Sequence, residues 1–297
     1  MLGETGVAHV AVLPAAELPE VLPELSLSIE AHHSGNVAHG ADRVHPFSGV
    51  GKLIFGAALA ELGAEDPALL AASISLLADH RARACTGTLR LLSGDMSFSV
   101  DDAANLVLST GDGAAALALL EFLERRGVDL RRTAQELLTR LKLTGTQVTG
   151  LEGPEGSAGE GVLGTTTPQD LLHLLTHLCA SMDEEEARWP TAIGPKASCA
   201  VLRWMRVVFE PGGLASALPG HGPHRVPHWT VSGWENLVQG EEQGCASVLI
   251  SHSNAAGWVC AAAFHPAWRD LPSVSSPREV SAAFGTVGLS AYLNRQA

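Results

Sequence analysis

The stretch GTLRLLSGDMSFSVDDAANLVLSTGDGAAALALLEFL, residues 87–123, organises the middle of this chain. Ser99 precedes Asp102 by three residues, which is the spacing of a capped helix start. Apolar residues then recur at helical spacing, so helices are expected to continue to about Arg126. This stretch therefore predicts that the middle of the chain is predominantly helical.

Further helices are expected on both sides of this stretch, and strands toward both chain ends. The expected helices cover Lys52–Leu62, 67–83, 130–141, a segment capped by Thr167, and 277–294. The expected strands cover 24–31, 36–40, 228–234, 246–253 and 257–265, and residues 144–164 are expected to form a long surface loop.

This order of elements predicts an α+β fold of three α/β/α layers. Strands from both chain ends would form one antiparallel sheet, with an all-helical subdomain inserted between them. We expect a single domain over 1–297, with an α/β part at 20–50 and 220–297 and a helical part at 51–219.

Composition excludes some partners. The formal charge is -13 and the pI is near 5.4, whereas nucleic acids and anionic membranes need basic patches. The chain begins without a basic segment and has no apolar run of about eighteen residues, so neither a secretory signal nor a membrane span is expected. Five scattered cysteines without a CxxC pair indicate a reduced, cytoplasmic protein. No cofactor is expected, and the sequence leaves the oligomeric state open.

The segment HPFSGVGKLIFGAALAEL, residues 45–62, reads as the entry to a helix. Gly49 and Gly51 are expected in its first turn, although a glycine inside a helix costs about 1 kcal/mol relative to alanine. Lys52 follows directly and would be carried toward the interior. Small residues placed there would let a ligand approach the backbone closely.

Several segments, in this order, resemble the class A β-lactamases and the related penicillin-binding-protein-like serine hydrolases. They are residues 87–123, LKLTGTQVTG, TTTPQDLLHLL, GLASALPG and VPHWTVSGW, and together they span nearly the whole chain. The resemblance implies a sheet-and-helix fold and a cleft lined by three motifs: Ser-x-x-Lys, Ser-Asp-Asn and Lys-Thr-Gly.

The chain departs from all three motifs. Lys52 matches the first lysine, but Gly49 occupies the position of the nucleophilic serine. The second motif reads Gly111, Asp112, Gly113, and the third reads Val231, Ser232, Gly233. The equivalent of the family's omega-loop glutamate is open, with Glu152 and Glu155 as candidates by location only. The resemblance therefore implies a degenerate member that cannot form an acyl-enzyme.

Lys52, Asp112 and Ser232 are the candidate catalytic residues. Lys52 could act as a general base when neutral or polarise a carbonyl when charged, or it could be a structural hydrogen-bonding hub. Asp112 could carry a proton, or cap a turn. Ser48, beside the glycine, could be a displaced nucleophile, although one helical step rotates a side chain by about 100°; the ordinary alternative is an N-cap serine.

Other residues are expected to bind the ligand rather than react with it. They are Ser48, Gly49, Gly111, Gly113, His228, Val231, Gly233 and Trp234. Val231 removes the lysine that, by the resemblance, would meet a substrate carboxylate. Trp234 and Trp229 could wall the site or simply pack in the core. His221, His224 and His228 lie close in sequence, but the prolines and glycines among them exclude a helical zinc site, so no metal is expected.

Three functional hypotheses follow. The first is a non-covalent enzyme of secondary metabolism, a cyclase, isomerase or lyase, acting on a largely apolar small molecule. The second is a pseudoenzyme that binds a ligand or partner. The third is a residual serine hydrolase using Ser48.

Overall fold

The computed structural model describes most of the chain. The described residues are 17, 25–31, 35–47, 49–84, 86–150, 163–181, 192–206, 213–218, 228–234, 245–253, 257–265, 284–285 and 287–288. Several sequence predictions fall outside them: Ser48, Glu152, Glu155, His221, His224 and most of the predicted 277–294 helix.

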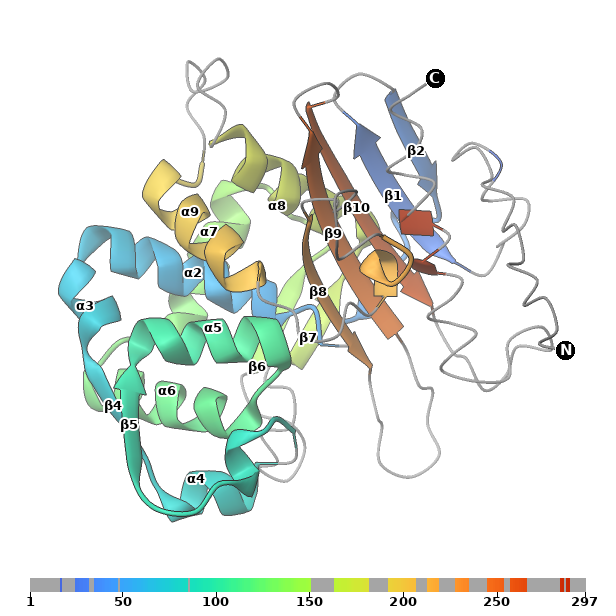
Figure 1. The fold of residues 1–297 in the computed structure, drawn as a ribbon. Helices are drawn as coiled ribbons and strands as arrows, with labels where there is room; N and C mark the ends of the chain where they lie inside the picture. The colour runs from blue at the N-terminus through green and yellow to red at the C-terminus, as the bar shows by residue number, and fades with distance from the viewer. Residues whose placement is uncertain are drawn as a thin grey trace, which may run out of the picture.

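A five-stranded antiparallel sheet joins the two ends of the chain, as predicted (Figure 1). Its strands are β1 (Ser26–Ala31), β2 (Gly35–His39), β8 (His228–Trp234), β9 (Cys245–Ser253) and β10 (Gly257–His265), in the order β2-β1-β10-β9-β8. The early strand β1 pairs with the late strand β10, Ser26 opposite Phe264. This pairing leaves β8 at one edge of the sheet.

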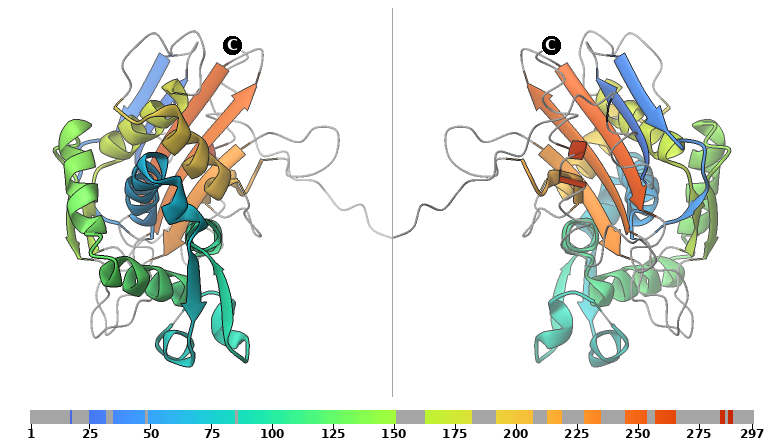
Figure 2. Two further views of the ribbon diagram at one scale, coloured as in Figure 1. Left: turned by 90° about the vertical axis from the view of Figure 1, so that its left-hand side faces the viewer. Right: turned by 90° about the vertical axis from the view of Figure 1, so that its right-hand side faces the viewer.

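The two faces of the sheet pack against different layers. Along β10, Cys260, Ala262 and Phe264 belong to the large hydrophobic cluster that includes the helices, whereas Ala261 and Ala263 belong to a smaller cluster on the other face. This alternation follows from the two-residue period of a strand. Helices α8 (Pro168–Ala180) and α9 (Pro195–Met205) cover the first face. The second face is covered by the 3-10 turn η5 (Gly213–Ala215) with Phe284 and Val287 (Figure 2).

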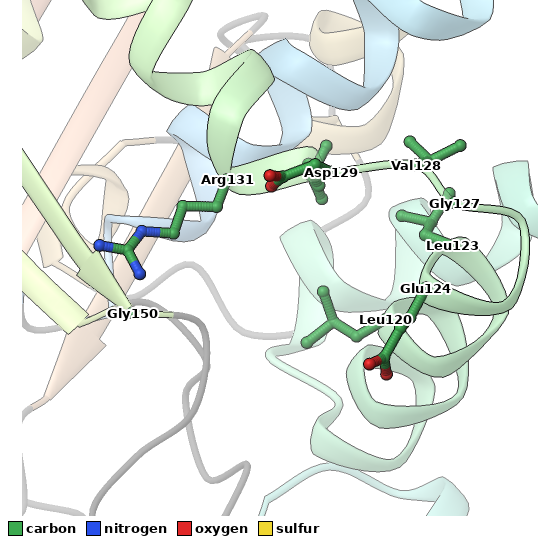
Figure 3. Close-up of a pocket in the computed structure, with 9 residues that line it drawn as sticks. Leu120, Leu123, Glu124, Gly127, Val128, Asp129, Arg131 and Gly150 are labelled. Carbon is green, nitrogen blue, oxygen red and sulfur yellow. The ribbon is translucent and has the colours of Figure 1, made fainter.

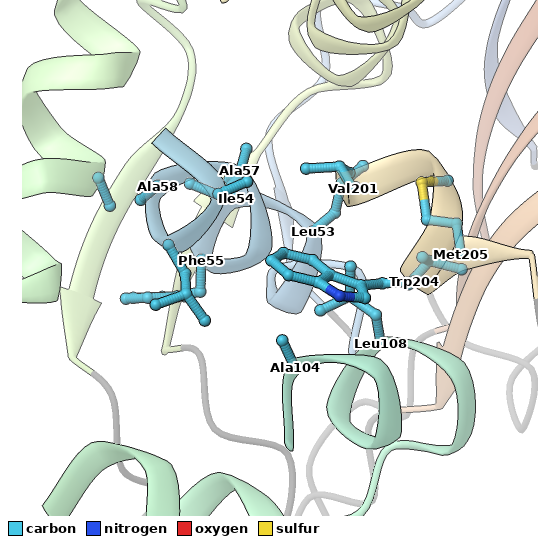
Figure 4. Packing of buried hydrophobic residues seen from close by; sticks show 14 of the residues in the cluster. Leu53, Ile54, Phe55, Ala57, Ala58, Ala104, Leu108, Val201, Trp204 and Met205 are labelled. Atoms are coloured by element: carbon cyan, nitrogen blue, oxygen red, sulfur yellow. The ribbon is translucent and has the colours of Figure 1, made fainter. Parts of the chain in front are cut away.

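Helix α2 (Lys52–Glu65) is the centre of the helical part. Every residue from Leu53 to Ala60 is buried, so the helix is apolar on all sides and must be surrounded. The helices around it are α5 (Val100–Thr110), α7 (Leu130–Arg140) and α9. Trp204 of α9, fully buried, packs between α2 and α5 (Figure 4), and its indole N–H donates to Asp101 at 3.0 Å.

One predicted helix is wrong. Residues 67–83 do not form a single helix but α3 (Pro67–Ala71), strand β4 (Ser73–Leu76) and α4 (Ala78–Arg83). β4 alternates exposed and buried residues and pairs with β5 (Met96–Ser99). The Ile-Ser-Leu alternation is a strand pattern, and pairing with a distant segment decides it over helix propensity.

Other predicted boundaries agree more closely. The predicted capping box of Ser99 and Asp102 is present, and Thr167 caps α8 as expected. α6 (Gly113–Arg125) follows α5. The inserted part also holds two short strands, β6 (Gln147–Gly150) and β7 (Leu163–Thr166), which join β3 (His45–Pro46) in the order β3-β7-β6.

The end of α7 is unusual. Leu143 N–H donates to Leu138 O and Lys142 N–H to Thr139 O, at 3.0 and 3.1 Å, which is the hydrogen-bonding pattern of a Schellman C-cap. The residue after the cap adopts a left-handed conformation, and glycine is usual there. Lys142 holds that position with φ 57°, the one positive φ of a non-glycine residue in the described chain.

Replacing Lys142 by glycine is therefore expected to stabilise the protein. The left-handed backbone costs a residue with a Cβ about 1–2 kcal/mol, partly offset by the greater freedom of glycine in the unfolded chain. Urea unfolding should show Lys142→Gly more stable by about 0.5–1 kcal/mol. Lys142→Ala is the control, because it keeps the Cβ and should show no such gain. Equal stability of the two variants would contradict the strain.

Candidate active site

Lys52 brings the three motif regions together. It is the first residue of α2, and its Nζ donates to the backbone carbonyl of Ser232 on β8 at 3.4 Å. A Cβ placed on Gly111, at the end of α5, would lie 3.4 Å from the same Nζ. Three segments far apart in sequence thus meet at one amine, which is half-buried.

Gly49 does not lie in the helix. Helix α2 begins at Lys52, and Gly49–Gly51 form the turn before it, so the prediction of both glycines in the first helical turn is wrong. Gly49 has φ 83°, a conformation that L side chains rarely adopt. Val50 N–H donates to Phe47 O at 2.9 Å and fixes the turn. The position three residues before Lys52 therefore has a backbone suited to glycine.

The second motif is shaped by its own backbone. Gly111 ends α5 in the left-handed region, φ 63°, and its carbonyl accepts a hydrogen bond from Thr86 Oγ1 at 2.7 Å. Gly113 begins α6 and donates its N–H to Thr86 O at 3.3 Å. Neither glycine offers a polar side chain to a ligand.

Asp112, between these glycines, is fully buried and serves four backbone donors. Its Oδ2 accepts from the N–H groups of Thr88 and Leu89 at 2.7 and 2.9 Å. Its Oδ1 accepts from Ala114 and Ala115, both at 3.1 Å, which caps α6. A carboxylate with these partners braces the 86–89 loop against the helix, and this geometry favours the capping interpretation over proton transfer.

The third motif meets Lys52 through its backbone. Val231 is 2% exposed and packs in the large cluster. The Ser232 hydroxyl lies 2.8 Å from Ser247 Oγ, which accepts from Leu214 N–H at 3.0 Å on the η5 side of the sheet. The Ser232 carbonyl accepts the hydrogen bond from Lys52 Nζ.

The remaining predicted residues of this strand are less informative. His228 begins β8, four residues before Ser232, about 13 Å along the strand. Gly233 and Trp234 lie at its other end, and the Trp234 side chain is outside the described residues.

One titratable residue beside the site was not singled out from the sequence. His45, in β3, is 8% exposed and stacks on Phe264 with ring centroids 4.9 Å apart. Its Nε2 is buried and has no hydrogen-bond partner among the described residues. Burial, together with the nearby Arg43 charge, lowers the pKa of His45 to about 4. His45 is therefore neutral in the folded protein at physiological pH.

Comparison with known proteins identifies the family. The model of the beta-lactamase enzyme family matches residues 24–290. The chain belongs to this family.

Solved structures agree with that assignment. A beta-lactamase from Sphaerobacter thermophilus is 17% identical, with 95% of this chain and 94% of that one covered, at a TM-score of 0.72. A class A beta-lactamase from Mycobacterium abscessus is 17% identical over 94% and 99% of the two chains, at 0.66. PBP-A is 17% identical over 94% of each, at 0.67. At these identities the likeness establishes the fold, and no curated protein matches the chain.

Two structural observations bear on ligands of other kinds. Among the described residues, no group of three or more His, Cys, Asp or Glu side chains is placed to hold a metal ion. No helix in the described part of the chain is long and apolar enough to cross a membrane.

Removing the Asp112 carboxylate should destabilise the fold strongly. Asp112→Ala would leave four N–H groups without their acceptor, three of them on the buried residues Leu89, Ala114 and Ala115, at a cost of about 3 kcal/mol or more. Asp102→Ala removes an exposed capping carboxylate instead and should cost about 1 kcal/mol. Urea unfolding of both variants measures the difference; similar losses would contradict the bracing role of Asp112.

His45 should make stability depend on pH. The unfolded chain takes up a proton near pH 6.5, whereas the folded chain does so only near 4, so stability falls as the pH drops through this window. The full loss is on the order of 3 kcal/mol. His45→Phe removes the titration and keeps the stack on Phe264. The stability difference between variant and parent should change by that amount from pH 7 to 4, and a pH-independent difference would refute it.

Proposed function

We propose that this β-lactamase-family protein binds a small molecule at the meeting point of its three motifs and converts it without an acyl-enzyme. The reaction would be of the cyclase, isomerase or lyase type, and the ligand a largely apolar secondary metabolite. The observation that carries the proposal is the left-handed Gly49 at the nucleophile position. A glycine has no oxygen to acylate, and its backbone there disfavours any residue that has one.

Lys52 supplies the chemistry in this proposal. Its amine contacts Ser232 O and borders Gly111, so it is held at the centre of the motifs. Partial burial of an amine costs hydration energy. The chain keeps this lysine although the serine of the same motif is absent, which supports a chemical role for the lysine. As a neutral amine it could accept a proton, and as an ammonium it could polarise a carbonyl.

Gly49 and Gly111, which carry no side chains, support the proposal that the ligand is sizeable and largely apolar. Gly111 carries no side chain beside Lys52, and the buried Val231 brings no charge where, by the resemblance, the family has a lysine. A ligand with few charges suits such surroundings, because it loses little hydration when it enters.

A non-catalytic binding protein is the second candidate. Asp112 is saturated by backbone donors and Ser232 Oγ by Ser247. Among the described motif residues, Lys52 is then the one side chain placed for acid–base chemistry. A single such group is little for a catalyst, and this favours the binding protein.

The deciding experiment is a ligand screen followed by a turnover assay. Neutral, apolar metabolites would be screened for thermal stabilisation of the full chain, and each hit incubated and followed by chromatography with mass detection. The proposal expects conversion by the parent and by Lys196→Met, an exposed-lysine control on α9. Lys52→Met should lose conversion and keep binding.

Two outcomes would contradict the proposal of an enzyme that uses Lys52. Binding without conversion by any protein favours the binding protein. Conversion that survives Lys52→Met removes the role given to that residue.

Gly49→Ser tests the backbone argument. The introduced serine would have to adopt a left-handed φ, so the variant should lose about 1–2 kcal/mol of stability in urea unfolding. It should also stay unlabelled by a fluorescent penicillin, because the strained turn does not aim the hydroxyl at Lys52. A stable variant that becomes labelled at the introduced serine would show that only the side chain was missing.

A further inference from the structure

A groove on the far side of the helical part has the character of a binding site. It lies between α7 with its C-terminal turn and strand β6, and encloses about 670 Å³. The residues that line it are Arg131, Gln135, Leu138, Thr139, Lys142, Leu143, Thr144, Thr146, Gln147, Val148 and Thr149. Cavities of roughly 300–1,000 Å³ are typical of small-molecule sites.

The described side chains that line the groove are positively charged, neutral polar or apolar. It contains two cations, four threonines and two amide side chains, over a buried apolar floor of Leu138, Leu143 and Val148. The described residues that line it include no carboxylate, although the chain as a whole carries a formal charge of -13. The groove therefore presents hydrogen-bond donors and positive charge in an otherwise acidic protein.

The cations of α7 differ in their pairing. Arg132 donates to Glu136 at 2.8 Å, and Arg140 pairs with Glu61. The two cations that line the groove, Arg131 and Lys142, have no ion pair with any described residue. Within the described part of the chain, Arg132 and Arg140 are thus neutralised by a carboxylate, whereas Arg131 and Lys142 are not.

The backbone supplies an independent observation. Lys142 holds the left-handed position of the Schellman cap, where glycine would be free of strain. Strain of this kind is characteristic of functional sites. A lysine at that position, bordering the groove, is explained if its charge binds a ligand.

A second hollow shares Arg131. It encloses about 640 Å³ and continues along the α6–α7 turn to Gly150. Figure 3 shows the Arg131 side chain extending away from Asp129 toward Gly150. Arg131 thus stands between the two hollows, with its guanidinium directed along the strand rather than to a neighbouring carboxylate.

We propose that the groove between α7 and β6 binds an elongated small organic anion with carboxylate or phosphate groups. Arg131 and Lys142 are eleven residues apart, about 16 Å along the helix axis, so they face the two ends of the ligand. The exposed hydroxyls of Thr144 and Thr149 and the amides of Gln135 and Gln147 bond its polar atoms. The floor of Leu138, Leu143 and Val148 takes an apolar middle. This site is separate from the motif cleft and does not depend on the function proposed for it.

Titration followed by amide NMR tests the site. The probes are suberate, a dicarboxylate with an apolar middle, inorganic pyrophosphate, and uncharged 1,8-octanediol as the control ligand. Suberate or pyrophosphate should shift the amides of 131–149 saturably, and the stronger of the two identifies the preferred anion. Added salt should weaken binding, because the attraction is between charges.

Matched variants assign the effect. Arg131→Gln and Lys142→Gln should each weaken binding at least about fivefold, the loss expected for a charge-assisted hydrogen bond. Arg132→Gln changes a neighbouring cation that is already paired and should leave binding unchanged. Lys142→Gly should bind more weakly although it is the more stable protein, which separates lost binding from lost structure.

Any of four results overturns the proposal. They are absence of shifts with both anions, equal shifts with 1,8-octanediol, shifts spread over all exposed cations without saturation, and equal weakening by Arg132→Gln.

Discussion

The burial of α2 is the constraint on which the rest of this structure depends. A helix that is apolar on every side has to be enclosed, and α3, α5, α7 and α9 enclose it. Because Lys52 is the first residue of that helix, enclosure of the helix fixes the amine against β8. The Asp112 carboxylate performs the matching task for the second motif, since it ties the 86–89 loop to the start of α6. The scaffold of the family is thus maintained by packing and capping that do not involve a nucleophile.

Two motif positions combine a glycine with a backbone suited to glycine. Gly49 and Gly111 both have positive φ, at 83° and 63°. A hydroxyl-bearing residue at either position would be strained, and at Gly111 its Cβ would also contact Lys52 Nζ. The backbone at both positions therefore disfavours the serines of the family's motifs.

The sequence predicted the fold well because its strongest signals are local or ordered along the chain. The capping box at Ser99, the Thr167 cap and the alternating terminal strands each appear where expected. The 67–83 helix failed because pairing of β4 with β5 is a tertiary contact that no local period encodes. In the site, the motif spacing singled out Lys52 and Gly111, and the structure places these two residues side by side.

The sequence could not predict where these side chains point or which groups they contact. The hydrogen bond between the hydroxyls of Ser232 and Ser247 depends on the register of β8 against β9. The burial of His45 depends on its stack against Phe264. The positive φ at Lys142 was equally invisible, because lysine gives no signal of a left-handed turn. Long-range geometry, not residue type, decides each of these.

The most direct test of the account is the intact mass of the unmodified protein after incubation with a penicillin and, separately, with a fluorophosphonate. The account predicts an unchanged mass with both reagents, since Gly49 stands at the nucleophile position and carries no hydroxyl. A stoichiometric adduct mapped to a serine beside Lys52, Ser48 included, would contradict it.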